Sequence, residues 1–448
     1  MVSVSPPPRY SAGSYGVDAE KPLGAGSAPA RAVNPTQPKT QPPKGATDEK
    51  KSTIKEYNPY HNPFSAEDTE ADKLYPYPHL KPCFPTDIST PEYQPIHNVV
   101  DRGSFADPAK RHLLSVVDKV DNLSVHIGTE LSGFQVKDLT PAQKDDLALL
   151  VAERGVVVLR DQDLGADELV NFGRYFGASE RPLHQHPSSG VPRARKLNGT
   201  SLDEVHTIWH DENMRPTGTL YTSTELWHSD VTFEKNPPGF TALYNITNPV
   251  HGGGDTLFSS CYGLYDALSP SMQEYLETLT ALHSGTEQAE GASKAGLHLR
   301  RPAVETEHPL VRTHPVTGWK SIFANPAFTR HIVGVPKVES DAILNMLYSI
   351  MNVDPNLTLR VRWQKNTLVL WNNAVVNHAA TFDHWRPDPS CRRHALRVAS
   401  TGEIPSTTLP DGRPGRSRQE AIWEQEGFDV EALKARGRKN IKNTGFKD

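Results

Sequence analysis

The chain has 448 residues, with 48 Lys and Arg against 53 Asp and Glu, and a formal net charge of −5. This balance gives no basic field that would favour nucleic acid or anionic lipid as a partner. The three cysteines, Cys83, Cys261 and Cys391, are too few and too far apart for a disulfide framework or a cysteine-based zinc site. With no apolar run near the ~20 residues of a membrane span and no secretory leader, we expect a cytoplasmic protein.

The amino-terminal part is predicted to stay outside the folded core. Residues 1–75 are rich in Pro, Gly, Ser, Thr and Lys and nearly lack aliphatic side chains. Such a segment buries too little apolar surface to offset the entropy lost on ordering, so we expect a disordered tail. Residues 76–123, which begin "YPYPHLKPCFP", are typical of an irregular, proline-studded arm wrapped around a domain.

Regular elements are predicted from residue 124 onward. "DLTPAQKDDLALLVAERG" has Thr140 as a helix N-cap, Pro141 at the first helical position and Gln143 completing a capping box. "GVVVLRDQ" follows as a buried strand, and the segments "ADELVNFGRYFG", "SPSMQEYLETLTAL" and "VESDAILNMLYSIM" favour helices.

Further strands are predicted at "TLFSS", "SIFAN", "LTLRVRW", "TLVLWNN" and "RHALRVAS". Strands outnumber helices, which predicts a mainly β fold with flanking helices, built on a double-layered antiparallel core such as a jelly roll. We expect one domain over 124–408, followed by a charged tail, helical or frayed, over 409–448.

A candidate metal site lies in "TELWHSDVTFEKNPPGF". In a strand, residues i and i+2 point to the same face, so His228 and Asp230 would project together. One imidazole and one carboxylate suit Fe(II), and a second histidine would complete a facial triad with open positions. On this pair alone, a histidine that simply meets a neighbouring acid is the better explanation.

A rival pair with the same spacing is His210 and Glu212, in "HTIWHDENMRPTG". That stretch lies among Asn, Arg, Pro and Gly, which favours a loop. The whole polar segment from about 192 to 222 could form a lid over a pocket. His228, among apolar residues, is the better candidate because its neighbours can exclude water.

The carboxy-terminal half adds chemistry that the local pattern does not explain. His378 follows the strand "NTLVLWNN", and "RRHALRVAS" carries Arg393 and Arg397 on one face of a strand. Two inward guanidinium groups would destabilise a core unless anions meet them. Arginine binds carboxylates and sulfonates in a bidentate manner, so the pocket is predicted to hold a metal and two anionic groups.

The chain resembles the TauD/TfdA family of Fe(II)- and 2-oxoglutarate-dependent dioxygenases, and within it the taurine and alkylsulfonate dioxygenases of the fungal type. The similar stretches lie between about 125 and 405 and include "GTELSG", "WHSDVTFEKNPPG", "GGGDTLFSS", "LVLWNN…NH" and "RRHALRV". The family has a double-stranded β-helix core of the jelly-roll or cupin type, with Fe(II) as cofactor and 2-oxoglutarate and O2 as cosubstrates.

The resemblance also implies roles for individual residues. His228, Asp230 and His378 match the iron ligands, and Arg393 with Thr256 matches the 2-oxoglutarate site. The substrate-binding positions of the family correspond to His186, Arg397 and Phe328. Four other histidines are expected to be structural or to support the site: His184, His283, His308 and His314.

Three departures from the family pattern bear on the substrate. Asn372, Asn373 and Ala374 stand where many relatives have Asp-Asn-Arg. Ser188 and Ser189 replace an aromatic residue, and Ala289 lies near the position of a pocket-closing phenylalanine. These changes predict a roomier or different pocket and put taurine itself in doubt.

The expected activity is hydroxylation of a small anionic alkylsulfonate, with release of sulfite and an aldehyde beside succinate and CO2. One alternative is the same chemistry on a carboxylate, an amino acid, a purine or a secondary metabolite. Another is a non-catalytic cupin-like binding protein. No nucleic acid or membrane partner is expected, and the sequence leaves a homo-oligomer open.

Overall fold

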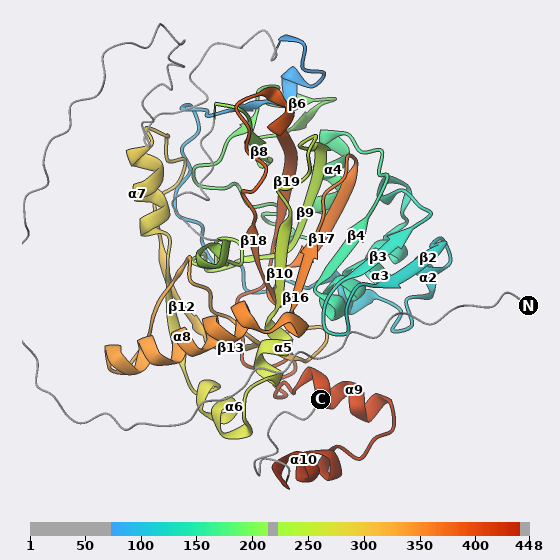
Figure 1. Cartoon of the computed structure of the whole chain (residues 1–448), viewed down its shortest axis with the longest axis vertical. Helices are drawn as coiled ribbons and strands as arrows, with labels where there is room; N and C mark the ends of the chain where they lie inside the picture. Colours follow the sequence, from blue (N-terminus) through green and yellow to red (C-terminus); the bar gives the residue numbers. More distant parts are fainter. Residues whose placement is uncertain (1–72, 214–222, 440–448) are drawn as a thin grey trace, which may run out of the picture. The chain divides into compact units, whose positions relative to one another are not determined.

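The structure is a computed structural model that describes residues 73–213 and 223–439, all of which belong to one compact unit (Figure 1). The predicted disordered tail over 1–75 lies almost entirely outside the described residues. Its last part does not: Tyr75 is buried, and its hydroxyl lies 2.8 Å from Thr247 Oγ1 and 2.7 Å from His394 Nδ1. The chain is therefore anchored to the core from Tyr75 onward.

A seven-stranded sheet forms the centre of the fold, in the order β2-β3-β4-β17-β9-β19-β8. Its strands pair antiparallel except for β3 and β4, which are parallel. The strands are β2 (Lys119–Asn122), β3 (Thr129–Ser132), β4 (Val156–Leu159), β8 (His206–His210), β9 (Pro238–Thr247), β17 (Thr367–Asn372) and β19 (Arg393–Thr401). The predicted mainly β architecture with added helices is confirmed.

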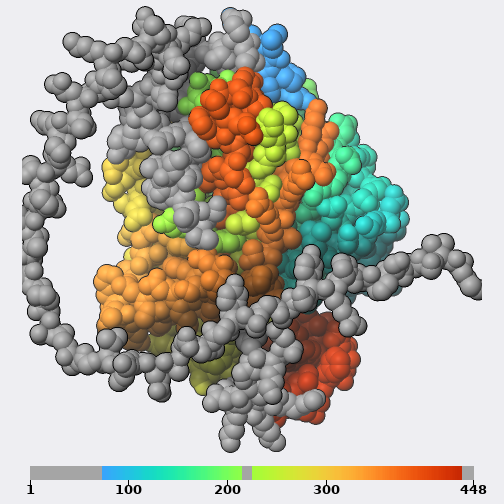
Figure 2. Space-filling view, in the orientation of Figure 1, coloured from blue at the N-terminus to red at the C-terminus, as the bar shows by residue number. Residues whose placement is uncertain are grey.

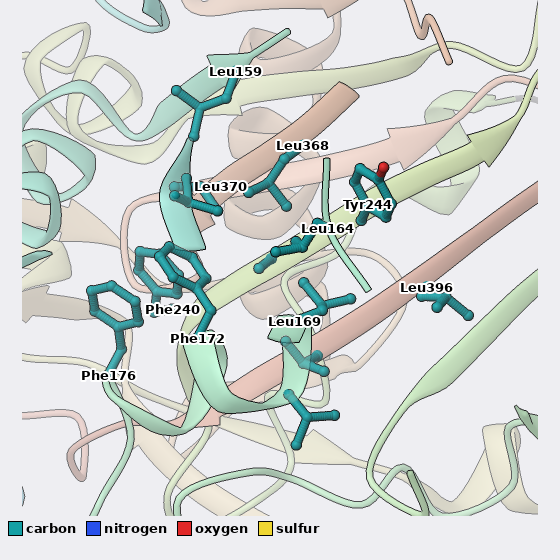
Figure 3. Close-up of a cluster of buried hydrophobic side chains, with 14 of the residues drawn as sticks. Leu159, Leu164, Leu169, Phe172, Phe176, Phe240, Tyr244, Leu368, Leu370 and Leu396 are labelled. Carbon is teal, nitrogen blue, oxygen red and sulfur yellow. The ribbon is translucent and has the colours of Figure 1, made fainter. Parts of the chain in front are cut away.

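Side-chain alternation gives this sheet two apolar faces. Along β17, Leu368 and Leu370 join one hydrophobic cluster, while Val369 and Trp371 join another. The first cluster packs against α3 (Pro141–Arg154) and α4 (Ala166–Arg174), as Figure 3 shows for Leu169 and Phe172 of α4. Full burial of each such side chain contributes roughly 1.5–3 kcal/mol, so this layer stabilises the strands that carry the site.

The start of α3 follows the prediction. The Thr140 hydroxyl accepts the Gln143 backbone N–H at 3.4 Å, and Gln143 Oε1 accepts the Thr140 N–H at 2.8 Å. This capping box satisfies backbone donors that the first helical turn leaves free.

The opposite face of the large sheet meets a three-stranded sheet of order β16-β10-β18. Phe258 on β10 and Val361 on β16 share a buried cluster with Trp371 and Val156 of the large sheet. The three strands are β10 (Thr256–Ser260), β16 (Thr358–Val361) and β18 (Val376–Ala380). The candidate site residues lie along the space between these two sheets.

A second three-stranded sheet, β12-β11-β15, packs with helices outside this pair. The helix predicted at "VESDAILNMLYSIM" (338–351) is confirmed as α8 (Lys337–Val353), which lies in the orange region at the lower left of Figure 2. The predicted helix "SPSMQEYLETLTAL" is half wrong: α6 ends at Leu276, and Thr280–Ser284 forms β11, because Ala281 enters the core as a strand residue. The elements here are β11 (Thr280–Ser284), β12 (Glu305–Pro309), β15 (Thr329–Ile332), α5 (Cys261–Asp266), α6 (Pro270–Leu276), α7 (Thr286–Lys294) and α8 (Lys337–Val353).

The segment predicted as a loop around His210 is a strand instead. His206–His210 forms β8, the edge strand that pairs with β19, with buried Trp209 and half-buried His206 and His210 alternating along it. Period-two burial on one side of the sheet is what stabilises an edge strand here, despite its polar sequence. The lid prediction for 192–222 falls partly on 214–222, which lie outside the described residues.

Short elements complete the described chain. They are α2 (Arg111–Leu114), β1 (Pro82–Cys83), β5 (Val191–Pro192), β6 (Lys196–Leu197), β7 (Thr200–Ser201), β13 (Val311–Thr313) and β14 (Lys320–Ile322). The tail predicted from 409 forms α9 (Arg418–Gln425) and α10 (Val430–Lys439). None of the helices in 73–213 and 223–439 is long and apolar enough to cross a membrane.

Candidate metal centre and anion sites

The backbone around His228 differs from the predicted strand. Ser223–Leu226 is a 3-10 helix, η6, and a turn begins at Asp230, where Val231 adopts a φ of +39°. Only His228 pairs as in a sheet: its N–H and C=O bond the C=O and N–H of His378 on β18, at 2.9 and 2.7 Å. This isolated bridge, rather than a strand face, brings the two histidines together, and the turn returns Asp230 to the same point.

His228, Asp230 and His378 converge as the sequence predicted. One ligand atom from each lies within 4.8 Å of the other two, and Asp230 Oδ1 is 3.9 Å from His228 Nε2 and 3.7 Å from His378 Nε2. Burial lowers the pKa of both imidazoles, so both are neutral at neutral pH. His228 Nδ1 lies 2.8 Å from the Leu226 carbonyl, which keeps the proton there and leaves Nε2 as a free lone pair.

Asp230 is held by contacts from three sides. Arg397 Nη1 donates to its Oδ1 at 2.7 Å, and the Thr241 hydroxyl donates to its Oδ2 at 3.2 Å. Burial on its own would raise the pKa of this carboxyl, but Arg397 and the neighbouring histidines outweigh burial and lower it to about 2. Asp230 is therefore an anion throughout the physiological range, as a metal-binding carboxylate must be.

Asn373 fixes the turn that carries Asp230. Its Oδ1 accepts the Asp230 backbone N–H at 3.1 Å and the Trp371 indole N–H at 3.1 Å. Its Nδ2 donates to Thr241 Oγ1 at 2.7 Å, which orients the hydroxyl that meets Asp230. The adjacent departure, Asn372, donates to His314 Nε2 at 3.0 Å instead of forming an ion pair.

Arg393 occupies a buried position without a partner for its charge. It is 3 % exposed, its Nε has no hydrogen-bond partner, and no ion pair of the described residues includes it. Burial lowers its pKa to about 10, with Asp255 acting in the opposite direction. Trp363 lies with its ring centroid 5.8 Å from the guanidinium carbon and donates its indole N–H to Thr256 Oγ1 at 3.0 Å. Arg393 and Thr256 thus both contact one tryptophan.

Two histidines lie next to Arg393: His210, which the sequence analysis set aside as a rival metal ligand, and His384, which it did not assign. His210, opposite Arg393 in the β8–β19 register, stacks on His384 with ring centroids 5.2 Å apart. Burial first and Arg393 second lower the pKa of both rings, which are therefore neutral. Gly254 allows this close packing: at a φ of +69°, a Cβ there would lie 3.1 Å from Arg393 Cδ.

A cavity lies on the other side of Asp230. Its lining includes Arg397, His186, His206, Val231 and Arg301. Arg397 Nη2 lies 2.7 Å from His206 Nδ1, and His186 packs on His206 with ring centroids 5.0 Å apart. The predicted residues His186 and Arg397 therefore meet at one cavity, beside the metal-ligand cluster.

Phe328 lies close to this cluster but not among the residues that line the cavity. Its ring packs against His228 at 6.1 Å and Phe233 at 5.2 Å between centroids. The remaining four histidines are buried and hydrogen-bonded: His184 to the Asn236 carbonyl, His283 to Thr232, His308 to the Glu234 carbonyl and His314 to Asn372.

A signal for the missed residues was present in the sequence. His206 and His210 have the same spacing as Arg397 and Arg393, and antiparallel pairing sets one histidine opposite each arginine. A strand reading of "HTIWH" would have placed both imidazoles on the face that carries the arginines.

Comparison with known proteins agrees with this geometry. The profile of the family described as "Taurine catabolism dioxygenase TauD, TfdA family" matches residues 119–399. A Schizosaccharomyces pombe protein named provisionally as an alpha-ketoglutarate-dependent sulfonate dioxygenase is 41 % identical, over 74 % of this chain and 81 % of its own. The alpha-ketoglutarate-dependent sulfonate dioxygenase of Saccharomyces cerevisiae is 36 % identical, over 74 % and 79 %.

A solved structure gives the same result for the fold. A taurine dioxygenase from Burkholderia xenovorans superimposes with a TM-score of 0.53 at 30 % identity, covering 67 % of this chain and 95 % of that one. With a family match over more than half of its residues, the chain belongs to the TauD, TfdA dioxygenase family.

Proposed function

We propose that this protein is an Fe(II)- and 2-oxoglutarate-dependent dioxygenase that hydroxylates an alkylsulfonate at the carbon bearing sulfur. The enzyme class follows from family membership. The observation that carries the proposal is the convergence of His228, Asp230 and His378 at one point. The half-buried Arg397 donates to Asp230 there, and the buried Arg393 lies on the same strand. Two neutral imidazoles and one carboxylate are the donor set of the non-haem Fe(II) oxygenases, which leave coordination positions open.

In this proposal Arg393 and Thr256 hold 2-oxoglutarate. The unpartnered Nε of Arg393 supports this, because a buried guanidinium without an anion is unstable and a carboxylate would satisfy it. When bound, Fe(II) with 2-oxoglutarate and O2 supplies the oxidising chemistry, which yields succinate, CO2 and one oxygen atom for the substrate.

The chain's own residues would position the substrate. Arg397 and His186 line the cavity beside Asp230 and would bind the sulfonate oxygens. Phe328 does not line this cavity and would act through its packing against His228. Insertion of oxygen at the adjacent C–H gives a 1-hydroxysulfonate. Loss of its hydroxyl proton with cleavage of the C–S bond then releases an aldehyde and sulfite.

The substrate tail is proposed to be larger than that of taurine. Ser188 and Ala289, two of the departures noted above, line one small cavity together with Phe233 and Arg301. Arg301 also borders the cavity that Arg397 lines, so the two cavities lie next to each other. The jelly-roll core proposed for the domain is supported by the two facing sheets and by the taurine dioxygenase superposition.

The test combines ligand variants with a product screen. Replacing His228, Asp230 or His378 by alanine should abolish succinate release and remove bound iron, whereas the exposed His331→Ala on β15 should keep both. The screen measures succinate and sulfite with alkylsulfonates, sulfate esters, carboxylates, amino acids and purines. Succinate without sulfite on a carboxylate or purine would replace the sulfonate assignment, and iron binding without any turnover would support a binding protein.

A further inference from the structure

The cavity beside Asp230 is lined by hydrogen-bond donors from three side chains. Arg397 already uses Nη1 on Asp230 and Nη2 on His206, and its buried Nε has no partner among the described residues. Besides Arg397 and His186, the cavity is lined by His206 from the edge strand β8.

Both histidines of the cavity have a defined tautomer. His206 Nδ1 accepts from Arg397 Nη2 at 2.7 Å, so its proton lies on Nε2. His186 Nδ1 accepts the backbone N–H groups of Ser188 at 3.2 Å and Ser189 at 3.0 Å, so its proton lies on Nε2 as well. Neither Nε2 has a hydrogen-bond partner among the described residues, and both rings line the cavity. Two imidazole N–H donors thus stand beside one guanidinium.

The imidazoles of His186 and His206 are held in place by neighbouring residues. Arg300, 2 % exposed, donates to the Ser189 carbonyl at 2.8 Å and so holds the turn that carries His186. His206 is fixed by its register opposite Arg397 on β19. Burial lowers the pKa of both imidazoles well below the usual range, and Arg397 acts in the same direction. Both therefore stay neutral donors.

We propose that His206 is a specificity-determining residue that makes this cavity selective for a tetrahedral anionic group with three terminal oxygens. Arg397, His186 and His206 approach from two strands and a turn, and so offer donors in three directions. A three-oxygen group can give each of the three donors an oxygen of its own. A carboxylate has enough lone pairs for three donors, but its two oxygens lie in one plane, so it meets donors from three directions with poorer geometry, which weakens binding. The inference rests on the proposed function, because it assigns the same cavity to the substrate anion.

The experiment uses full-length protein loaded anaerobically with Fe(II) and 2-oxoglutarate and titrated calorimetrically. The probes share a butyl chain: 1-butanesulfonate, butyl sulfate, butylphosphonate and pentanoate. His206→Asn keeps an oxygen near the Nδ1 position to accept from Arg397 but lacks the distal donor, whereas His206→Gln can place an N–H near the Nε2 position. We expect His206→Asn to lower the sulfonate-to-pentanoate affinity ratio about tenfold, and His206→Gln to retain most of it.

Three results would go against the inference. An unchanged sulfonate-to-pentanoate affinity ratio in His206→Asn, or an equal loss of affinity for all four anions, would mean that His206 only positions Arg397. Wild-type preference for pentanoate over every three-oxygen anion would overturn the proposal directly. If wild-type protein binds none of the four, the sulfonate assignment itself fails. The relative affinities of sulfonate, sulfate ester and phosphonate identify which three-oxygen group the cavity takes.

Discussion

Arg393 and Arg397 lie four residues apart on β19, each opposite a histidine of β8, yet their surroundings are opposite in kind. Arg397 is paired with Asp230 at 2.7 Å, while Arg393 has no ion-pair partner among the described residues. One arginine therefore stabilises the empty fold by neutralising a buried carboxylate, and the other opposes folding until an anion arrives. The same residue type, on one face of one strand, is neutralised by a carboxylate of the protein in one place and has no such partner among the described residues in the other.

The largest effect is expected from Arg393→Met. Loss of the guanidinium should weaken 2-oxoglutarate binding about a thousandfold, because a buried charge pair loses one partner. The ligand-free protein should be as stable as wild type or more so, since folding lowers the pKa of this base to about 10 and the charged form then costs about 3 kcal/mol at neutral pH.

Anaerobic titration with 2-oxoglutarate and urea unfolding of metal-free protein measure the two quantities separately. The exposed Arg362→Met on the neighbouring segment is a matched control and should change neither. A clear loss of stability in Arg393→Met would mean that Arg393 has a structural partner after all.

Arg397→Met should give the opposite result in the same unfolding experiment. Asp230 would stay buried at 3 % exposure without its cation, which should cost about 3 kcal/mol in the metal-free protein. Without Arg397, burial should raise the pKa of Asp230 from about 2 to above the ordinary value of 3.8. This loss of stability should therefore develop as the pH rises from 3.8 through the new folded-state pKa, because the folded protein must then hold a buried charge without a partner.

Kinetics provide the second arm for Arg397. The milder Arg397→Lys should raise the KM for the sulfonate far more than the KM for 2-oxoglutarate, because lysine cannot bind an anion through two N–H groups as arginine does. Equal changes in both KM values would contradict the proposal that Arg397 binds the sulfonate and Arg393 binds 2-oxoglutarate.

A smaller effect is expected from Asn373→Leu, which removes two of the contacts that hold Asp230 without touching Arg393. Iron affinity should fall about tenfold, the usual size for a lost contact to a metal ligand. The 2-oxoglutarate affinity at saturating iron should be unchanged. Metal-competition titration measures the first quantity, and a shift in both would show that Asn373 supports the whole site.

The sequence predicted the chemistry of this site better than its geometry. His228, Asp230 and His378 were predicted from residue type and motif, and their convergence is found, but by an isolated backbone bridge and a turn with a positive φ at Val231. Non-local pairing of this kind leaves no periodic pattern to read. His206 was missed for a related reason, because a polar edge strand looks like a loop until its partner strand is known.

The smallest effect is expected from Thr140→Ala, which tests whether the difference between Arg393 and Arg397 depends on the overall stability of the fold. Thr140→Ala removes the N-cap of α3, on the sheet face away from both arginines, and should cost about 1 kcal/mol in urea unfolding. Thr140→Ser keeps the hydroxyl and should restore most of that loss. Because the β17 and β19 register is set by the sheet itself, affinities for iron, 2-oxoglutarate and sulfonate should stay within twofold of wild type. A parallel loss of 2-oxoglutarate affinity in Thr140→Ala would show that the position of the unpartnered Arg393 depends on the overall stability of the fold. The helices that cover the sheet would then be needed to keep Arg393 buried.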